Sequence, residues 1–328
     1  MAHDEQRWLS PRLQKAAALC NQAPAASESP LWLGIDLGTC DVVSMVVDRD
    51  GQPVAVCLDW ADVVRDGIVW DFFGAVTLVR RHLATLEQQL GCRFTHAATS
   101  FPPGTDPRIS INVLESAGLE ISHVLDEPTA VADLLQLDNA GVVDIGGGTT
   151  EVAVISLGGI VTSSSLRLAG NRMDEAIAMH LRDLLGIKIG ERTAEIIKIK
   201  IGSILPFEDG RERDMIISGQ DVITEQPKEV TIQSEDVRSA LVQPCEEMVV
   251  HIKETFKKTN PDLASDIIQN GILLTGGGGL LSGLDRYLTD KLEIPVWTSE
   301  TALTNVVMGC LKVLETPTAL KQTLMRSK

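Results

Sequence analysis

Two short segments each place an aspartate beside glycines and threonines, directly after an apolar stretch. They are residues 34–39 (GIDLGT) and residues 143–150 (VDIGGGTT). Glycines let backbone N–H groups approach an anion without a Cβ in the way, and threonine hydroxyls can donate to the same anion. Aspartates held at such turns can organise a hydrated Mg²⁺. Two facing turns of this kind would grip a polyphosphate, whereas the alternative interpretation is two ordinary glycine-rich hairpins.

The candidate anion-binding residues in the two turns are Gly38, Thr39, Cys40, Gly146, Gly147, Gly148, Thr149 and Thr150.

A third glycine run, Gly276, Gly277 and Gly278, follows an apolar stretch and precedes a helical pattern. A strand-to-helix turn of this kind could receive the nucleoside end of a ligand, or it could be a plain connection. It is not a Walker A loop, because no Gly-Lys-Ser/Thr follows it.

Charged side chains at the starts of two predicted helices are further candidates for catalysis and for contacts with a ligand. Glu127 lies between a strand and a helix. Its carboxylate could orient an attacking water, or it could merely be an acid stabilised by the helix dipole. Glu191, Glu195 and Lys198 could reach a ribose or base, or could form a solvated, salt-bridged helix face. Neither a zinc-binding H-E-x-x-H nor a G-x-S-x-G nucleophile motif is present.

Composition limits the partners. The net charge is −16 and aromatic residues make up 4% of the 328 residues, so DNA and RNA are poor partners. The six cysteines include no Cys-x-x-Cys, as expected in a reducing cytosol. We expect no secretory signal and no transmembrane segment, because no apolar run reaches the roughly 18–20 residues that span a bilayer.

The hydrophobic pattern alternates between strand and helix periods from residue 31 onward. It predicts strands over 31–36, 42–48, 96–101, 123–125, 141–145, 151–157, 160–165, 215–218, 229–233, 272–275 and 296–298. It predicts helices over 72–90, 108–117, 128–136, 172–185, 193–205, 234–258, 280–292 and 304–314. The fold class is therefore α/β, with two similar halves around a cleft.

Residues 1–30 form a separate region. Ser10-Pro11 is typical of a helix start, and residues 21–30 (NQAPAASESP) of a linker. A short amphipathic helix on a tether could be an address for a membrane or a protein shell, or simply a frayed tail.

The three glycine turns resemble the phosphate 1, phosphate 2 and adenosine motifs of the actin, Hsp70 and sugar-kinase superfamily. Residues 1–150 also resemble the EutJ family of ethanolamine-utilisation proteins, whereas residues 144–315 are similar to the MreB/Mbl family of bacterial actins. The resemblance to EutJ is carried by residues 31–48, 66–76, 97–108 and 126–150, and that to MreB/Mbl by residues 144–165, 189–203 and 261–285. The two resemblances meet in DIGGGTT, which both families share, and this suggests recombination or a chimera.

The resemblance implies a two-lobed actin-like ATPase fold, built from duplicated ribonuclease H-like domains, with ATP and Mg²⁺ as cofactors. Asp36 and Asp144 would hold Mg²⁺ through water, and Glu127 would polarise the hydrolytic water. Its phosphate contacts would be Gly38, Thr39, Gly147, Thr149 and Thr150, and its nucleoside contacts Glu191, Glu195 and Lys198 with Gly276, Gly277 and Gly278 beneath the adenosine.

The sequence departs from the MreB pattern at one place. MreB proteins carry an insertion, subdomain IB, where this chain has only residues 49–65. We therefore expect an N-terminal helix and linker (1–30), a first lobe without a full IB subdomain (31–143), a second lobe (144–300) with subdomain IIB at about 190–260, and a C-terminal helix (301–328) that returns to the first lobe. A cleft with one short wall predicts slow hydrolysis. The resemblance to bacterial actins implies that longitudinal filament contacts use the missing region, which puts polymerisation in doubt.

The function predicted from these features is an ATP-dependent conformational switch with weak ATPase activity and a chaperone-like role in ethanolamine utilisation. Its partners would be ATP and ADP, with client or microcompartment proteins. It would act in the cytoplasm, with a microcompartment or the inner membrane as places of attachment. The alternative is an MreB-like filament that self-associates to determine cell shape. A small-molecule kinase is a third class, but the sequence offers no clear acceptor pocket or base for it.

Overall fold

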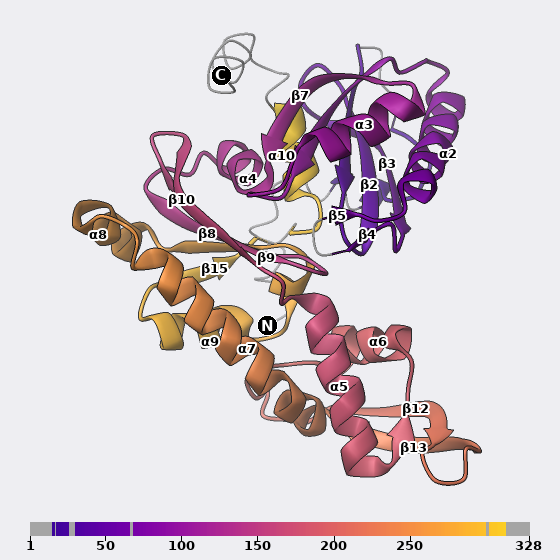
Figure 1. The fold of residues 1–328 in the computed structure, drawn as a ribbon, viewed down its shortest axis with the longest axis vertical. Helices are drawn as coiled ribbons and strands as arrows, with labels where there is room; N and C mark the ends of the chain where they lie inside the picture. The colour runs from indigo at the N-terminus through magenta and orange to yellow at the C-terminus, as the bar shows by residue number, and fades with distance from the viewer. Residues whose placement is uncertain (1–14, 17, 26–29, 66–67, 300–301, 313–328) are drawn as a thin grey trace.

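The computed structural model describes residues 15–16, 18–25, 30–65, 68–299 and 302–312. Two lobes lie one above the other, each built around a five-stranded sheet (Figure 1). The first sheet has the order β3-β2-β1-β6-β7 and the second the order β10-β9-β8-β14-β15. In both, three antiparallel strands are followed by two parallel ones. The duplicated α/β architecture predicted from the sequence is therefore confirmed.

The strands of the two large sheets are β1 (Trp32–Leu37), β2 (Asp41–Val47), β3 (Pro53–Trp60), β6 (His96–Phe101), β7 (Glu120–Asp126), β8 (Ala140–Ile145), β9 (Thr150–Ser156), β10 (Gly159–Leu166), β14 (Ile272–Thr275) and β15 (Val296–Thr298). The helices are α2 (Phe72–Leu90), α3 (Arg108–Ala117), α4 (Glu127–Leu135), α5 (Gly170–Leu185), α6 (Glu191–Ile201), α7 (Ser234–Phe256), α8 (Pro261–Asn270), α9 (Leu284–Leu292) and α10 (Asn305–Lys312), with a 3₁₀ turn at Gly277–Leu280.

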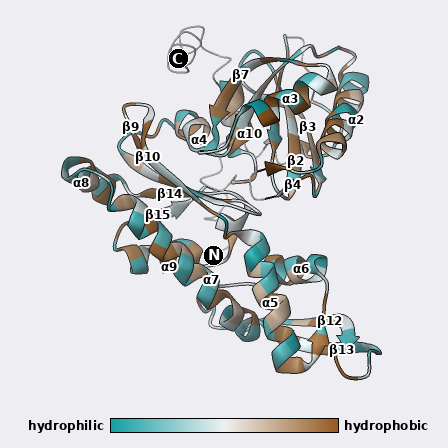
Figure 2. Cartoon of the chain, in the orientation of Figure 1, coloured by the Kyte–Doolittle hydropathy of each residue, from teal (hydrophilic) through white to brown (hydrophobic). Residues whose placement is uncertain are grey.

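Helix α2 shows why the sequence folds locally as it does. Asp71 caps it by accepting a hydrogen bond from the Gly74 N–H (2.9 Å), and Gly91 ends it in the left-handed region at φ 63°. Its buried side chains recur every three or four residues and face the first sheet. Figure 2 shows the resulting mixture of hydrophobic and hydrophilic stretches along α2 and α7.

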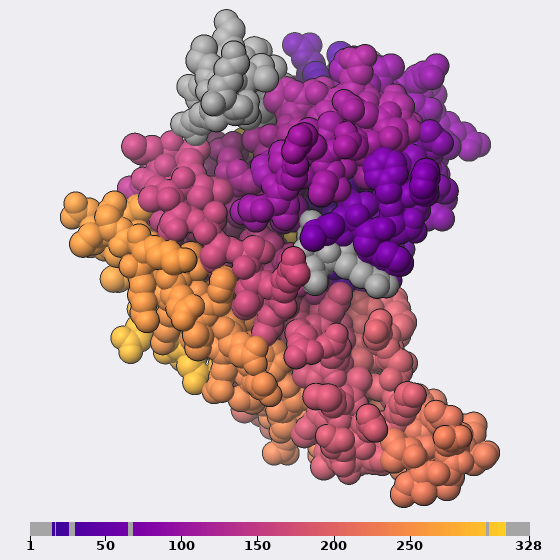
Figure 3. All heavy atoms as spheres, viewed as in Figure 1, coloured from indigo at the N-terminus to yellow at the C-terminus, as the bar shows by residue number. Residues whose placement is uncertain are grey.

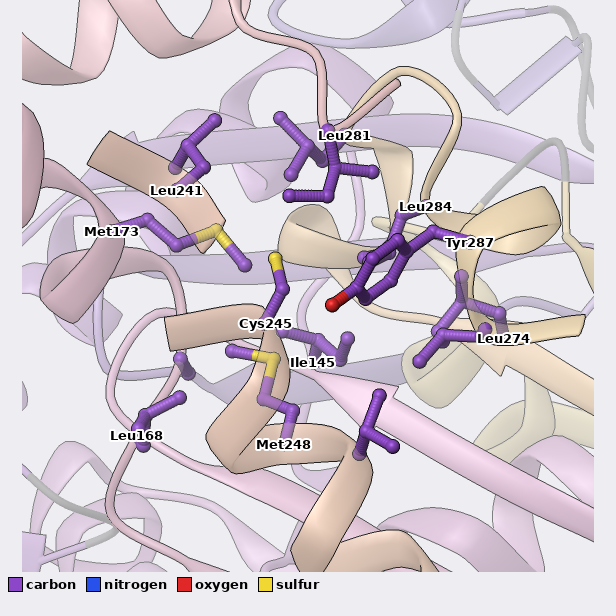
Figure 4. Packing of buried hydrophobic residues seen from close by; sticks show 14 of the residues in the cluster. Ile145, Leu168, Met173, Leu241, Cys245, Met248, Leu274, Leu281, Leu284 and Tyr287 are labelled. Carbon is purple, nitrogen blue, oxygen red and sulfur yellow. The ribbon is translucent and has the colours of Figure 1, made fainter. Parts of the chain in front are cut away.

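The core of the second lobe packs α5, α7 and α9 against its sheet. In Figure 4, Cys245 and Met248 lie beside Ile145, and the side chain of Met173 and the ring of Tyr287 lie on either side of Cys245. This core continues to the strand end that carries Asp144, so packing of the lobe fixes the position of that carboxyl group.

The outer parts of the lobes differ in size. The second lobe extends into a three-stranded sheet of β11 (Ile187–Lys188), β12 (Asp214–Asp221) and β13 (Pro227–Gln233). In the described part of the first lobe, the hairpin of β4 (Val64–Arg65) and β5 (Ile68–Val69) is all that lies between β3 and α2. In the space-filling view the outer end of the second lobe projects well beyond the first (Figure 3).

Helix α10 lies beside α4 (Figure 1) and also packs on strand β1 of the first lobe. The approach is close, because a Cβ built on Gly309 would lie 2.0 Å from the carbonyl oxygen of Ala130. Lys312 Nζ donates to the carbonyls of Asp133 and Leu134 at the end of α4 (2.7 and 2.9 Å). The C-terminal part of the sequence thus completes the core of the first lobe.

Several elements differ from those predicted from the sequence. The unpredicted elements are strands β3, β4, β5 and β11 and helix α8. The predicted helix 193–205 is wrong at its end, because α6 stops at Ile201, and the predicted helix 280–292 is wrong at its start, because a 3₁₀ turn ending at Leu280 separates it from α9. Part of the predicted linker also lies against a strand. The Asn21 and Ala25 N–H groups donate to Val56 and Val54 of β3 (2.8 and 2.7 Å). The helix predicted after Ser10 falls largely outside the described residues.

Candidate functional site

A cleft of about 590 Å³ lies between the lobes, at the ends of their central strands. Both predicted Asp-x-Gly turns and the third glycine run line it. The predicted residues in its lining are Asp36, Gly38, Thr39, Cys40, Glu127, Asp144, Gly146, Gly147, Thr149, Glu195, Lys198, Gly276, Gly277 and Gly278. Residues that are far apart in the sequence are thus brought to one place.

Three predicted residues are not part of this lining: Gly148, Thr150 and Glu191. Thr150 is fully buried, and its hydroxyl donates to the carbonyl of Leu168 (2.6 Å). Thr150 therefore holds the strand end in place rather than facing the cleft. Glu191 is an exposed residue at the first position of α6.

The floor of the cleft carries four carboxyl groups: Asp36, Glu127, Asp144 and Glu151. Burial, together with repulsion between the groups, raises the pKa values of Glu127 and Asp144 well above their usual range. Burial likewise raises the pKa of Asp36, although a hydrogen bond from Ser100 Oγ (2.7 Å) opposes the shift. Such a floor favours a cation-bearing ligand, because a bound cation would relieve the repulsion.

Glu151 was not identified from the sequence. Glu151 pairs with Asp144 in the antiparallel ladder of β8 and β9. Only 1% of Glu151 is exposed, and this burial raises its pKa to about 7. Ser165 Oγ donates to its carboxylate (3.1 Å). Residue type and spacing do not distinguish Glu151 from other strand residues, whereas its pairing with Asp144 places it on the face of the sheet that meets the cleft.

The donor set fits Mg²⁺ held mainly through water. In the described part of the chain, no three His, Cys, Asp or Glu side chains are placed to hold a metal directly. Mg²⁺ usually keeps several waters and uses one or two carboxylates plus phosphate oxygens, so Asp36 and Asp144 are suited to it.

Glu127 projects into the cleft because its neighbour takes the capping role. Asp126 Oδ1 accepts the N–H of Thr129 (2.9 Å) and caps α4. Glu127 is the first residue of that helix and lines the cleft opposite Asp144 and Glu151. Glu127 is also the acidic residue in the first turn of α4, so its carboxylate lies both in the cleft and at the positive end of the helix dipole.

Lys198 brings a positive charge to the second turn. Its Nζ donates to Asp174 Oδ2 (2.8 Å) and to the carbonyl of Gly170 (2.9 Å), next to Gly146. Burial raises the pKa of Asp174 to about 6 despite this pair. The ammonium group is thus held beside the turn that is predicted to bind phosphate.

The two Asp-x-Gly turns touch across the cleft. Cys40 Sγ donates to Asn171 Oδ1 (3.0 Å), and a Cβ on Gly147 would lie 2.0 Å from the same sulfur. Gly276 has φ 80°, and its Cβ would lie 2.2 Å from Asp144 Oδ1. A larger residue at Gly147 would push the two turns apart, whereas one at Gly276 would push the third glycine run away from Asp144 and Ile145 within the second lobe.

Asp41, next to the first turn, is a second cleft carboxyl that the sequence analysis missed. Burial raises its pKa to about 7, with smaller contributions from the charges of Asp36 and Glu195. Because Asp41 comes from the first lobe and Glu195 from the second, no local pattern indicates that they interact.

The arrangement of the duplicated sheets, with the cleft at their strand ends, defines an actin-like ATPase fold. A structure of MreB5 from Spiroplasma citri bound to ADP matches with a TM-score of 0.77 and 26% identity, over 91% of this chain and 99% of that one. A structure of EutJ from Carboxydothermus hydrogenoformans matches with a TM-score of 0.71 and 28% identity, over 91% and 96%. The predicted fold class is confirmed.

The profile of the MreB/Mbl protein family matches residues 59–322, so the chain belongs to this family. It is 39% identical to the cell shape-determining protein Mbl of Bacillus subtilis, over 84% of this chain and 93% of that protein. It is 82% identical to EutJ of Salmonella typhimurium over 181 residues, which cover 52% of this chain and 65% of that protein. The predicted double resemblance is confirmed, and the high identity to EutJ is confined to about half of the chain.

Within the described residues, no helix has the length and apolarity needed to cross a bilayer.

Proposed function

We propose that the chain is a nucleotide-dependent conformational switch that binds Mg²⁺-ATP in the cleft and hydrolyses it slowly. The observation that carries this proposal is the meeting of two Asp-x-Gly turns above an acidic floor. The relatives support it, since the MreB5 structure is described as bound to ADP.

Each side chain has a proposed role. Backbone N–H groups of the two turns, with Thr39 and Thr149, would bind the phosphates. Asp36 and Asp144 would hold waters around Mg²⁺, which when bound neutralises phosphate charge. Glu127 would orient the attacking water and accept its proton.

The nucleotide is proposed to contact both lobes, and the cleft is proposed to close by a movement of one lobe relative to the other. Residues 31–143 would move against residues 144–300, while the C-terminal helix stays with the first lobe. The nucleoside would lie between α6 and the third glycine run, near Glu195 and Lys198. Because the first lobe has a small outer part, we expect incomplete exclusion of water and slow turnover.

Calorimetry with Mg²⁺-ATP tests the site. We expect saturable heat of binding with the wild-type chain and none with Asp144→Ala. Asp290→Ala, an exposed aspartate on α9, serves as the control and should bind like wild type. Absence of binding by a folded wild-type chain, or unchanged binding by Asp144→Ala, would contradict the assignment.

The half of the chain that resembles EutJ favours a role in ethanolamine utilisation, in the cytoplasm, with client or microcompartment proteins as partners. A chaperone-like action on such clients belongs to this proposal. Affinity capture from cells grown on ethanolamine tests it: recovered proteins should depend on ATP and should be lost with Asp144→Ala.

The similarity to Mbl over most of the chain favours a second candidate, a filament that determines cell shape. Sedimentation and negative-stain microscopy with Mg²⁺-ATP distinguish the two. Regular filaments would favour this candidate, and a chain that stays in the supernatant with ATP would favour the switch.

A further inference from the structure

Trp60 and Arg192 face each other across the mouth of the cleft. Trp60 ends strand β3 of the first lobe, and Arg192 is the second residue of α6 in the second lobe. The Arg192 Cζ lies 4.9 Å from the centroid of the Trp60 ring. A guanidinium above an indole face is attracted by the negative potential of the ring, so this contact holds the two lobes together.

The contact is connected to the predicted nucleoside site. Trp60 lines the cleft, and Arg192 also pairs with Glu195, which lines it one turn further along α6. Among the described tryptophans, Trp60 is the one in the cleft lining, and 52% of it is exposed. The Trp60 indole can therefore contact a ligand in the cleft as well as Arg192 of the second lobe.

The unequal lobes explain why this pair matters in addition to the Cys40–Asn171 contact between the lobes. Among the described residues, the outer sheet of the second lobe has no counterpart of similar size in the first, where the β4–β5 hairpin alone follows Trp60 before α2. Closure at the cleft mouth therefore relies on the end of β3. The strand is well anchored, since β3 pairs with β2 up to the Asp41–Trp60 register position.

We propose that Trp60 and Arg192 form a clasp that closes the cleft over the nucleoside end of the bound nucleotide and slows its release. The inference rests on the proposed nucleotide-binding function and adds two positioning residues to it. The pair favours the closed arrangement of the lobes, and a ligand that binds both lobes gains affinity in proportion to the closed population.

The test measures release of a fluorescent ATP analogue by stopped flow, after mixing the loaded protein with excess unlabelled Mg²⁺-ATP. Trp60→Leu and Arg192→Gln should each release the analogue about two- to fivefold faster, the change expected for losing an exposed cation–aromatic contact. Trp60→Phe keeps an aromatic face and should retain most of the slow release.

The double variant and a matched control give the test its specificity. Trp60→Leu combined with Arg192→Gln should be no faster than either single variant, because both remove one interaction. Trp70→Leu is the control: Trp70 lies in the same lobe and is 53% exposed, but it is not in the cleft lining and its Nε1 donates to Asp62 (3.3 Å). Fully additive effects, or equal release from Trp60→Leu and wild type, would overturn the clasp.

Hydrogen exchange of the unliganded protein separates this inference from the proposed function. Residues 36–41 and 146–151 should exchange faster in Trp60→Leu than in Trp70→Leu, because the cleft opens more often. If the wild-type chain binds no nucleotide but this difference is seen, Trp60 and Arg192 still hold the lobes together, whereas the proposed ligand and its slow release are contradicted. Equal exchange in the two variants would overturn the clasp whatever the chain binds.

Discussion

The four carboxyl groups on the cleft floor have different surroundings, and these suit them to different tasks. Ser100 donates to Asp36 and Ser165 to Glu151, so both carboxylates are fixed by neighbouring strands. Glu127 begins a helix that Asp126 already caps, so its carboxylate is available to a ligand in the cleft. This difference favours Glu127 as the group that acts on water.

Replacing Glu127 with Gln should separate hydrolysis from binding. The amide keeps the shape of the side chain but cannot accept a proton, so ATP hydrolysis should fall by about 100-fold or more. Binding should persist, because one of four repelling acids is removed. Phosphate release and calorimetry measure the two effects. Glu115→Gln, on the exposed face of α3, is the control, and loss of binding together with turnover would contradict the assigned role.

At the scale of elements, close contact between α10 and α4 joins the C-terminal part of the sequence to the first lobe. Gly309→Ala would place a methyl group 2.0 Å from the carbonyl oxygen of Ala130, so the helices must separate. We expect a loss of about 1–3 kcal/mol in the free energy of unfolding, as for other overpacked cores. Urea denaturation measures it. Gly190→Ala, whose Cβ would meet nothing within 4 Å, should lose less, and only because alanine is a poorer N-cap than glycine at the start of α6.

The contact of the N-terminal segment with β3 gives a second prediction at this scale. Asn21 Nδ2 donates to the Leu58 carbonyl (2.7 Å), its Oδ1 accepts the Leu58 N–H (2.9 Å), and its φ is 53°. Asn21→Ala loses both hydrogen bonds and strains the backbone, so it should lower the free energy of unfolding by about 1–2 kcal/mol. Asn21→Gly loses the bonds without the strain and should cost less. Equal denaturation midpoints for all three proteins would show that the segment does not hold the strand.

Sequence patterns predicted elements best where their ends are chemically marked. Helix α2 was predicted at its observed bounds because its apolar period is long and Gly91 stops it. Helix α8 was missed because Asn260-Pro261 was interpreted as the end of one helix, whereas the Asn260 side chain caps the next by accepting the Leu263 N–H (2.8 Å). Strand β3 was missed because it lies within residues 49–65, which were interpreted only as a connection.

The candidate site was predictable only in its local parts. The glycine turns, Asp36, Asp144 and Glu127 stand out from residue type and spacing alone. Asp41 and Glu151 do not, because their importance comes from strand register and from groups in the other lobe. The exposure of Glu191 and the burial of Thr150 likewise depend on how helices and strands pack, which a linear motif does not record.

At the scale of the whole molecule, the two lobes meet through like charges as well as through contacts. Asp41 of the first lobe and Glu195 of the second both approach the cleft, and burial raises the pKa of Asp41 to about 7. Burial also raises the pKa of Glu151 to about 7 and the pKa of Asp174 to about 6. Closing the cleft without a cation therefore brings together groups that prefer to be protonated.

The raised pKa values make the free energy of unfolding depend on pH, and they determine the sign of that dependence. The folded chain holds these protons up to about pH 6–7, whereas the unfolded chain releases them near the ordinary values of about 4. The stabilising effect of protonation is therefore largest at low pH within this window and is lost as pH rises through the folded-state pKa values. Each proton held contributes a slope of about 1.4 kcal/mol per pH unit between them.

We accordingly expect the free energy of unfolding of the unliganded chain to decrease as pH rises from about 4 to 7, as measured by urea denaturation. Asp41→Asn removes one titrating group and should flatten this slope, whereas Asp290→Asn on the exposed face of α9 should leave it unchanged. Saturating Mg²⁺-ATP should also flatten the slope, because a bound cation favours the ionised carboxylates and so replaces the protons. A slope that ligand leaves untouched, with Asp41→Asn still flattening it, would place the ligand away from the acidic floor.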